Sequence, residues 1–269
     1  MTATTKPDPG PDAGPDSPRP SAWSGVRTLV FDVLGTVVDE SGSIAEQVTA
    51  ALAAAGADPA GGPALAARWN DRVDALTSQA AAGRVPWRSN DELRRAALVE
   101  TLAPTRPADA PAPAAGAVGA GVASLGAAAL EELALAGHRL RPWPDSGPAL
   151  RVLARSFTVV ALSNASLAQL ANMFAAGGLT WHGVLSGELV QAYKPDPAVY
   201  QLAIRLLGLD PAETMMVAAH PWDLRAAAGH GLRTAYVARP GEGAPEPGDR
   251  FDVRAGDLAE LAAMLAGSG

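Results

Sequence analysis

The sequence predicts an α/β fold in which one doubly wound parallel sheet is interrupted after its first strand by a helical insertion. From Phe157 onward, short apolar runs alternate with stretches of helical periodicity, which is typical of parallel strands joined by crossover helices. A further apolar run, Arg27–Asp32, is separated from that alternation by a long, mostly helical stretch. The economical arrangement places this first strand in the same sheet and the intervening residues in a cap above it.

The first strand is expected at Arg27–Asp32, an apolar run that ends in a carboxylate and is followed by Gly35. A continuous apolar run before a turn is typical of a strand buried on both faces. Asp32 is therefore expected at the carboxyl end of a strand, where doubly wound sheets bind their ligands.

Residues 43–142 are expected to form the cap. Ala, Leu and Trp recur at helical spacing from Ser43 to about Leu102, with charges between them. Residues 103–128 are almost entirely Ala, Pro and Gly, too poor in large apolar groups for a packed core, which predicts a flexible insertion. Helical periodicity returns near Leu130 and is broken at Pro142, where we expect the boundary.

The remainder of the chain is expected to complete the core domain, which comprises residues 25–42 and 143–269. Extended segments are predicted at residues 157–162, 214–219 and 234–237, and helices from about Leu167, at 200–207 and at 224–229. The first 24 residues are rich in Pro, Asp and Gly, which predicts a disordered arm.

Composition excludes several classes of function. The net charge is -7 and no run of Lys or Arg occurs, so no surface for nucleic acid or anionic lipid is expected. The chain has no Cys, which excludes disulfides, thiolate metal sites and cysteine nucleophiles. No secretory signal or membrane-spanning run is visible, and with a mean hydropathy of +0.08 we expect a soluble cytoplasmic protein.

Four short segments with polar side chains fall where predicted strands end: residues 32–36, 162–164, 193–196 and 219–223. Because the carboxyl ends of parallel strands share one edge, these segments are expected to form one site. In order and spacing they resemble the four motifs of the haloacid dehalogenase superfamily over about residues 26–240, and most closely those of the (S)-2-haloacid dehalogenases. The resemblance implies a Rossmann-like core with an inserted helical cap, hydrolytic cleavage of carbon–halide bonds in short (S)-2-haloalkanoic acids, no cofactor, and a homodimer.

Two positions separate this chain from the phosphatases of the same superfamily. Leu34 stands where a phosphatase has the second Asp that protonates its leaving alcohol, whereas a departing halide needs no proton. Ala219 stands where the first metal-binding Asp of the fourth motif falls, which leaves Asp223 as the acidic residue of that segment and an incomplete site for Mg²⁺. A Mg²⁺-dependent phosphatase and a non-dehalogenating binding protein remain the alternatives.

Roles follow from the resemblance and from the chemistry of the side chains. Asp32 is expected to displace the halide and form an ester, which water then hydrolyses at the Asp32 carbonyl. Lys194 would keep Asp32 ionised and oriented, and Asp223 would position or activate the water. Contacts to Asp32 or to the substrate are further expected from Thr36, Leu34, Ser163, Asn164, Tyr200, Asn70 and His220.

Some positions depart from the family. His220 replaces a common Asn, and in the cap the family's Trp-Arg pair, whose Arg helps to bind the substrate and the leaving halide, corresponds to Trp69-Asn70. Arg68 and Arg72 flank Asn70, but residues two apart on a helix point to different faces. Trp222 is a site candidate by its position alone, and His138, His182 and His230 lack metal-ligand spacing, so no metal is expected.

Overall fold

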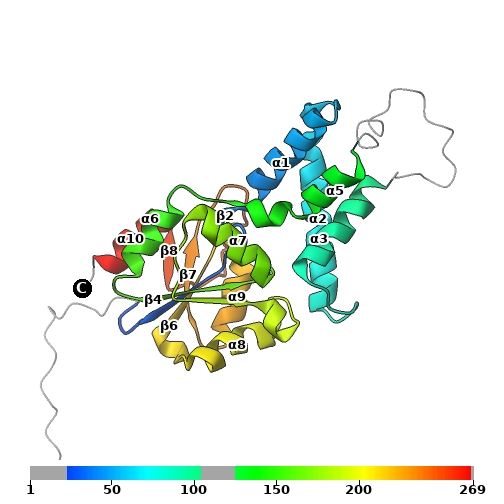
Figure 1. The fold of residues 1–269 in the computed structure, drawn as a ribbon. Helices are drawn as coiled ribbons and strands as arrows, with labels where there is room; N and C mark the ends of the chain where they lie inside the picture. The colour runs from blue at the N-terminus through cyan, green and yellow to red at the C-terminus, as the bar shows by residue number, and fades with distance from the viewer. Residues whose placement is uncertain (1–22, 104–124, 268–269) are drawn as a thin grey trace, which may run out of the picture.

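The computed structural model describes residues 23–103 and 125–267 and confirms the predicted α/β architecture (Figure 1). Its main sheet has six strands in the order β5-β4-β1-β6-β7-β8, and every pair is parallel. The strands are β1 (Thr28–Phe31), β4 (Thr158–Ser163), β5 (Gly183–Ser186), β6 (Thr214–Ala218), β7 (Arg233–Val237) and β8 (Val253–Ala255). Because β1 lies between β4 and β6, Asp32 leaves the sheet at the middle of its carboxyl edge.

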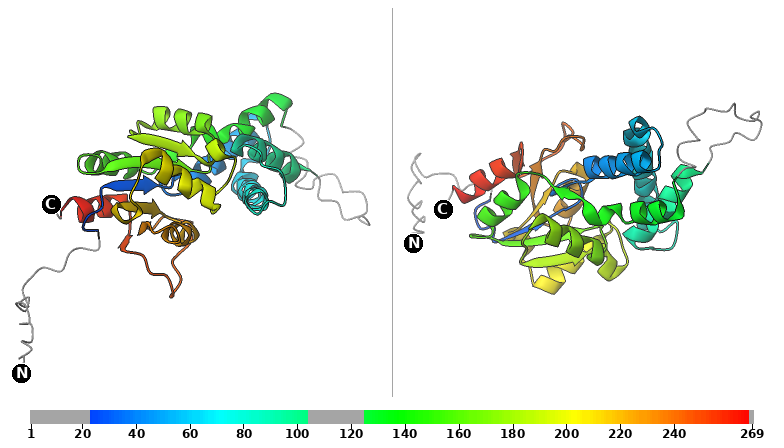
Figure 2. Two further views of the ribbon diagram at one scale, coloured as in Figure 1. Left: turned by 90° about the horizontal axis from the view of Figure 1, so that it is seen from below. Right: turned by 45° about the horizontal axis from the view of Figure 1, so that its top comes forward.

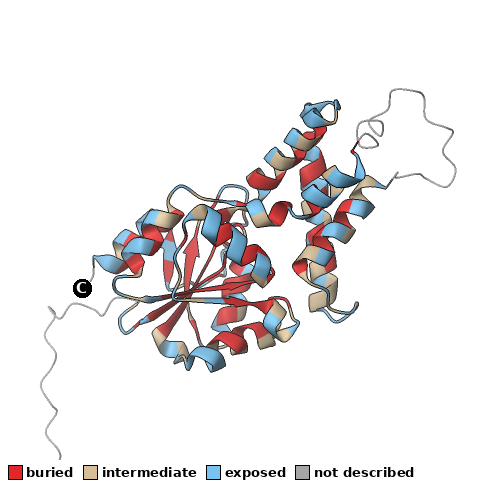
Figure 3. Ribbon diagram, viewed as in Figure 1, coloured by how far each residue is buried: buried red, intermediate tan, exposed pale blue. Residues whose placement is uncertain are grey.

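The two faces of the sheet carry separate apolar layers, and the strands are mostly buried (Figure 3). Leu29 and Phe31 point to one layer and Val30 to the other, as the two-residue period of a strand requires. The first layer is closed by α6 (Ser146–Leu153), α7 (Leu167–Gly177) and α10 (Leu258–Ala266), and the second by α8 (Pro197–Leu207) and α9 (Pro221–Ala228).

The cap consists of α1 (Glu40–Ala54), α2 (Gly62–Ala81), α3 (Asn90–Leu102) and α5 (Ala127–Ala134). Its helices gather at one end of the core, opposite α10 (Figure 2). The Trp69 side chain is fully buried between them, and its Nε1 donates to the Arg94 carbonyl oxygen at 2.9 Å. The region is helical, as its periodicity predicts, and Trp69 is a core residue of the cap.

Two extended segments join the cap to the core. They are β2 (Val38–Asp39) and β3 (Arg141–Pro142), which pair antiparallel in a sheet of their own. The first cap helix begins at Glu40, earlier than the expected Ser43. The Asp39 side chain accepts a hydrogen bond from the Gly42 N–H. This N-cap interaction stabilises the first turn of α1 and explains the earlier start of the helix.

Short 3-10 helices complete the described chain: η1 (Pro59–Gly61), η2 (Ala136–Arg139), η3 (Gly187–Val190) and η4 (Pro211–Glu213). The expected disordered arm and most of the expected flexible insertion lie outside the described residues. In the described ranges, no helix combines the length and the apolar character needed to cross a membrane.

Candidate active site

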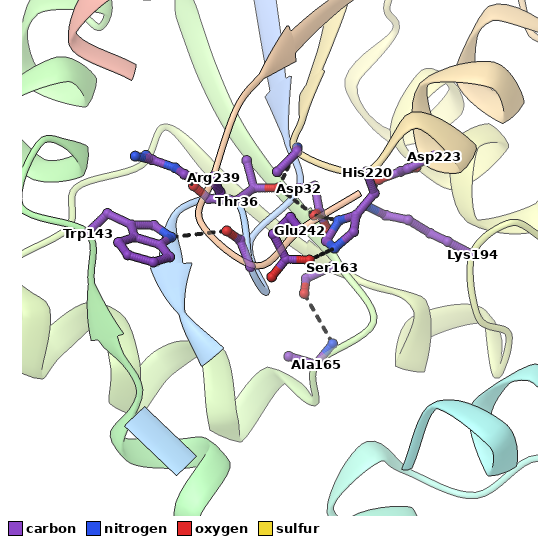
Figure 4. A network of polar contacts seen from close by, with 12 residues as sticks. Asp32, Thr36, Trp143, Ser163, Ala165, Lys194, His220, Asp223, Arg239 and Glu242 are labelled. Carbon is purple, nitrogen blue, oxygen red and sulfur yellow. Dashed lines mark hydrogen bonds and ion pairs between the residues drawn. The ribbon is translucent and has the colours of Figure 1, made fainter. Parts of the chain in front are cut away.

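The loop that follows β1 is held by two long side chains that lie next to each other (Figure 4). Trp143 Nε1 donates to the Gly35 carbonyl oxygen at 3.0 Å, and Arg239 Nε donates to the Thr36 carbonyl oxygen at 2.9 Å. Gly35 has a φ of +74°, in the left-handed region that favours glycine. These contacts fix the backbone around Asp32.

The Asp32 carboxylate accepts three hydrogen bonds and is buried. Lys194 Nζ lies 3.0 Å from Oδ1, while Thr36 Oγ1 lies 2.7 Å and His220 Nδ1 lies 2.9 Å from Oδ2. Burial alone raises the pKa of a carboxyl group, but Lys194 and His220 outweigh it and hold the pKa of Asp32 well below its ordinary value. Asp32 is therefore an ionised, oriented carboxylate at neutral pH.

Lys194 joins Asp32 to a second buried carboxylate. Its Nζ lies 2.7 Å from Asp223 Oδ2, and the Tyr200 hydroxyl donates to Asp223 Oδ1 at 2.6 Å. Burial lowers the pKa of a lysine, but Asp223 and Asp32 reverse that effect and raise it. Burial raises the pKa of Asp223, and Asp32 adds to this rise, whereas Lys194 opposes it. The pKa values of the two carboxyl groups therefore shift in opposite directions, and Asp32 is the one held firmly ionised.

His220 contacts the Asp32 carboxylate oxygen that Lys194 does not, Oδ2. Its Nε2 lies 3.0 Å from Glu242 Oε2, and its ring packs at 5.6 Å on that of Trp222. Burial opposes protonation, but hydrogen bonds to Asp32 and Glu242 raise the pKa of His220 to about 10. At neutral pH this side chain is an imidazolium that donates from both nitrogens.

A cavity of about 100 Å³ lies over Asp32 and shares Asn164, His220 and Trp222 with a wider cavity of about 770 Å³. Leu34 and Asn164 line the smaller one, and the Asn164 side chain accepts the backbone N–H of Lys194 at 2.8 Å. The geometry offers a small space above an ionised carboxylate, as displacement at carbon requires.

Three expected site residues lie behind this space. Tyr200 is 1% exposed and its hydroxyl serves Asp223, and Ser163 is 0% exposed and accepts the Ala165 N–H at 3.1 Å. Asp223 is also 0% exposed, with both oxygens occupied. None of them lines the cavities around Asp32, so these three side chains lie beneath the cavity walls.

The expected cap residue Asn70 borders a neighbouring cavity of about 100 Å³, together with Glu40 and His220. Its Oδ1 is buried and has no hydrogen-bond partner. Neither flanking arginine replaces it: Arg68 is exposed, and Arg72 pairs with Glu100 on the cap surface. Asn70 therefore brings an unsatisfied neutral amide to the edge of the site.

Arg94, which the motif pattern does not single out, lines the cavity over Asp32. The side chain is 1% exposed; Nε donates to Asn90 Oδ1 at 3.1 Å, Nη2 pairs with Glu40, and Nη1 is buried without a hydrogen-bond partner. Burial lowers the pKa of Arg94 to about 10, so it remains a cation at neutral pH. One feature of the sequence could have indicated Arg94, namely its position on the same buried face of α3 as Leu93 and Ala97.

Glu242 is the second residue that the motifs do not indicate. It lies in the segment after β7 and reaches the site by folding back toward β1 (Figure 4). A Cβ at Gly35 would lie 2.6 Å from Glu242 Oε1 and 3.1 Å from His220 Cε1. The bare glycine therefore makes room for both side chains. Among the described residues, no group of three or more His, Asp or Glu side chains is arranged to hold a metal ion.

In sequence comparisons, residues 26–231 match the family of haloacid dehalogenase-like hydrolases. The (S)-2-haloacid dehalogenase 1 of Pseudomonas sp. (strain CBS-3) is 36% identical over 105 residues, which are 38% of this chain and 46% of that protein. The (S)-2-haloacid dehalogenase of Xanthobacter autotrophicus is 35% identical over 112 residues, or 41% and 44% of the two chains. The chain thus spans about half the length of the curated relatives it matches.

Solved structures match over nearly the whole described chain. A crystal structure of an L-2-haloacid dehalogenase has a TM-score of 0.77 at 34% identity, covering 90% of this chain and 100% of its own. A defluorinating L-2-haloacid dehalogenase has a TM-score of 0.76 at 33% identity, covering 89% and 95%. The L-2-haloacid dehalogenase of Xanthobacter autotrophicus with chloropropionic acid covalently bound has a TM-score of 0.70 at 25% identity, covering 91% and 100%.

Proposed function

Because the chain belongs to the haloacid dehalogenase-like hydrolases, we propose that it hydrolyses short (S)-2-haloalkanoic acids through a covalent ester of Asp32 and without a metal ion. The observation that carries the proposal is the Asp32 carboxylate, which is buried from solvent, held ionised and lines a small cavity. The names of the relatives support the substrate class. The covalently bound chloropropionic acid in one relative supports the intermediate.

In the first step, an Asp32 oxygen attacks the second carbon of the substrate, and the halide leaves with the electron pair of the broken bond. The carbon is inverted. No proton donor is required because halides are weak bases, which suits the apolar Leu34 beside the cavity. Lys194 and His220 keep the attacking carboxylate ionised, and Asp223 holds Lys194 in position.

In the second step, water adds to Asp32 Cγ and the bond between Cγ and the substrate oxygen breaks. The product is a 2-hydroxy acid, and Asp32 regains a carboxylate that contains one oxygen from water. The charge that develops on the Asp32 oxygens lies within reach of Lys194 Nζ and Thr36 Oγ1. Donors fixed in advance around such a charge accelerate acyl transfer.

The substrate carboxylate requires a cation, and we assign this part to Arg94. Its Nη1 is a buried donor without a partner beside the cavity, and leaving such a group unpaired costs about 1–3 kcal/mol or more. A bound carboxylate would satisfy it. Asn70, at the family's Arg position, offers only a neutral amide.

Halide release from a panel of 2-haloacids tests the proposed function, with Asp32→Asn as the control variant. Release from (S)-2-chloropropionate that is lost in Asp32→Asn is expected. Mg²⁺-dependent phosphate release from phosphate esters would replace the proposal with the phosphatase alternative, and haloacid binding without turnover would replace it with a binding protein. From the same resemblance we also propose a homodimer, and from the composition of the sequence a cytoplasmic location.

A further inference from the structure

We propose that His220, oriented by Glu242, is the general base that activates water for hydrolysis of the Asp32 ester. The inference rests on the proposed function, since it assigns the second half of that reaction. His220 touches the reacting carboxylate and acts as a catalytic residue, whereas Glu242 acts through His220 and is a positioning residue.

The geometry places His220 between two carboxylates. Its Nδ1 lies 2.9 Å from Asp32 Oδ2, and its Nε2 lies 3.0 Å from Glu242 Oε2. The Asp32 side chain is buried, with an exposure of 9%, whereas His220 and Glu242 are part-buried at 20% and 19%. A carboxylate on the far nitrogen of an imidazole fixes its orientation and the nitrogen that carries the proton. Nδ1 is thereby left to act next to Asp32.

Access to water separates His220 from the other candidate base, Asp223. His220 lines the cavity over Asp32 and the wider cavity of about 770 Å³. Asp223 is 0% exposed and lines neither, and its two oxygens are occupied by Lys194 and Tyr200. Water that enters through the wider cavity meets His220, while Asp223 is sealed beneath Lys194.

The reaction itself switches His220 from acid form to base form. Charged groups face it from every side: Asp32 after β1, Glu242 after β7, Asp74 on α2, and the cavity neighbours Glu40, Arg94 and Lys194. Alkylation turns Asp32 into a neutral ester and removes the carboxylate in contact with Nδ1. The pKa of the imidazolium then falls, and its proton leaves to solvent as the halide departs.

Neutral His220 next takes a proton from water at Nδ1 while the water oxygen bonds to Asp32 Cγ. The tetrahedral intermediate collapses, the bond from Cγ to the substrate oxygen breaks, and the departing oxygen takes the proton back from Nδ1. One water is consumed, and one halide, one proton and one hydroxy acid are released. Asp32 is released as the carboxylic acid and passes the second proton of the water to Nδ1, which restores the Asp32 carboxylate and the protonated form of His220.

Single-turnover measurements with enzyme in excess over (S)-2-chloropropionate test this assignment. Mass spectrometry of the quenched Asp32 peptide follows the ester, and a pH indicator follows the proton. In the wild type, a proton burst is expected with halide release and before ester hydrolysis. In His220→Gln, halide release and ester formation should persist while ester hydrolysis slows by about 10²-fold or more, since general bases typically contribute 10²–10⁴-fold.

The Glu242→Gln variant gives a second readout and covers the case in which His220→Gln does not fold. Its ester hydrolysis should slow, and the pH at which the hydrolysis rate is half-maximal should shift from that of the wild type, because a neutral amide no longer favours the imidazolium. His182→Gln, at an exposed histidine near β5, is the matched control and should match the wild type in both steps.

Two results would overturn the inference: ester hydrolysis at the wild-type rate in both variants, or loss of ester formation itself in both, which would assign the pair to halide displacement. Absence of any ester in the wild type would instead refute the proposed function. The two failures are therefore distinguishable in one set of measurements.

Discussion

Lys194→Met removes the cation that joins Asp32 to Asp223 and leaves two carboxylates in the interior. Lys194 Nζ lies 3.0 Å from Asp32 and 2.7 Å from Asp223. The exposed fractions of the side chains are 1% for Lys194, 9% for Asp32 and 0% for Asp223. At such separations one pair is worth about 6 kcal/mol at an effective dielectric constant near 20. Because desolvation offsets part of this, removing one partner of a buried pair costs about 3–5 kcal/mol. We expect a loss of that size in the free energy of unfolding at pH 7.5.

The sign of the pH dependence follows from proton binding. Without Lys194, the pKa values of Asp32 and Asp223 rise, so the native variant takes up a proton that the wild type does not bind. Stability then increases as the pH falls wherever the native state binds more protons than the unfolded state. The loss relative to the wild type should therefore shrink between pH 7.5 and pH 5, while turnover stays low because Asp32 loses its counter-charge.

Urea unfolding of both proteins at the two pH values measures the effect. Arg27→Met is the matched control, because Arg27 pairs with Glu213 at 3.1 Å but is 76% exposed; its cost should stay below about 1 kcal/mol. A Lys194→Met loss no larger than the control, or one unchanged between the two pH values, would refute the reasoning that Lys194 compensates two buried carboxylates.

Three further predictions concern the same site. Asn70→Arg should raise turnover of (S)-2-chloropropionate, and Arg94→Gln should lower it by about 10²-fold. Arg68→Ala or Arg72→Ala should change turnover less than either. Steady-state halide release measures all four variants, and unchanged turnover in the first two would contradict the roles assigned to Asn70 and Arg94. Exhaustive EDTA treatment should leave haloacid turnover intact, whereas a loss restored by Mg²⁺ would show metal dependence. The contribution of protonated His220 to stability should be full below its ordinary pKa of 6.5 and disappear as the pH rises toward about 10. In urea unfolding, His220→Asn should therefore lower the free energy of unfolding by at most about 4 kcal/mol at pH 7 and by progressively less above it. A loss that does not change with pH would contradict the raised pKa.

The central strands were predictable because burial on both faces leaves a continuous apolar run, as at Leu29, Val30 and Phe31. Edge strands lack that signal. In β8, Arg254 points to solvent between two buried residues, and in β5 Val184 is exposed. The two-residue pairing of β2 with β3 joins segments on either side of the cap, so no local pattern marks it. Sheet order and long-range pairing depend on tertiary context that propensity does not contain.

Part of the site was predictable because a doubly wound sheet brings its strand ends together. Asp32, Lys194 and His220 come from distant segments and meet at one carboxyl edge for this reason. The direction of a side chain within that edge was not predictable, since it depends on which polar partner is nearest. Tyr200 is the example, because its hydroxyl is used by Asp223.

Residues that reach the site from outside the strand ends required the structure. Arg94 and Arg95 are adjacent in sequence, yet one is 1% exposed and the other 46% exposed. The packing of α3 against the rest of the cap decides which of them is buried. Glu242 approaches His220 through a loop whose path follows no periodic pattern.

A single turnover in heavy-oxygen water tests the central claim, that Asp32 is alkylated and then hydrolysed at its own carbonyl. Enzyme in excess over (S)-2-chloropropionate is quenched after one turnover, and the Asp32 peptide and the hydroxy acid are analysed by mass spectrometry, with Asp32→Asn as the control. Heavy oxygen is expected in the Asp32 side chain, and ordinary oxygen in the new hydroxyl of the product. Heavy oxygen in the product and none in Asp32 would show that water attacks the substrate directly, and would contradict the account.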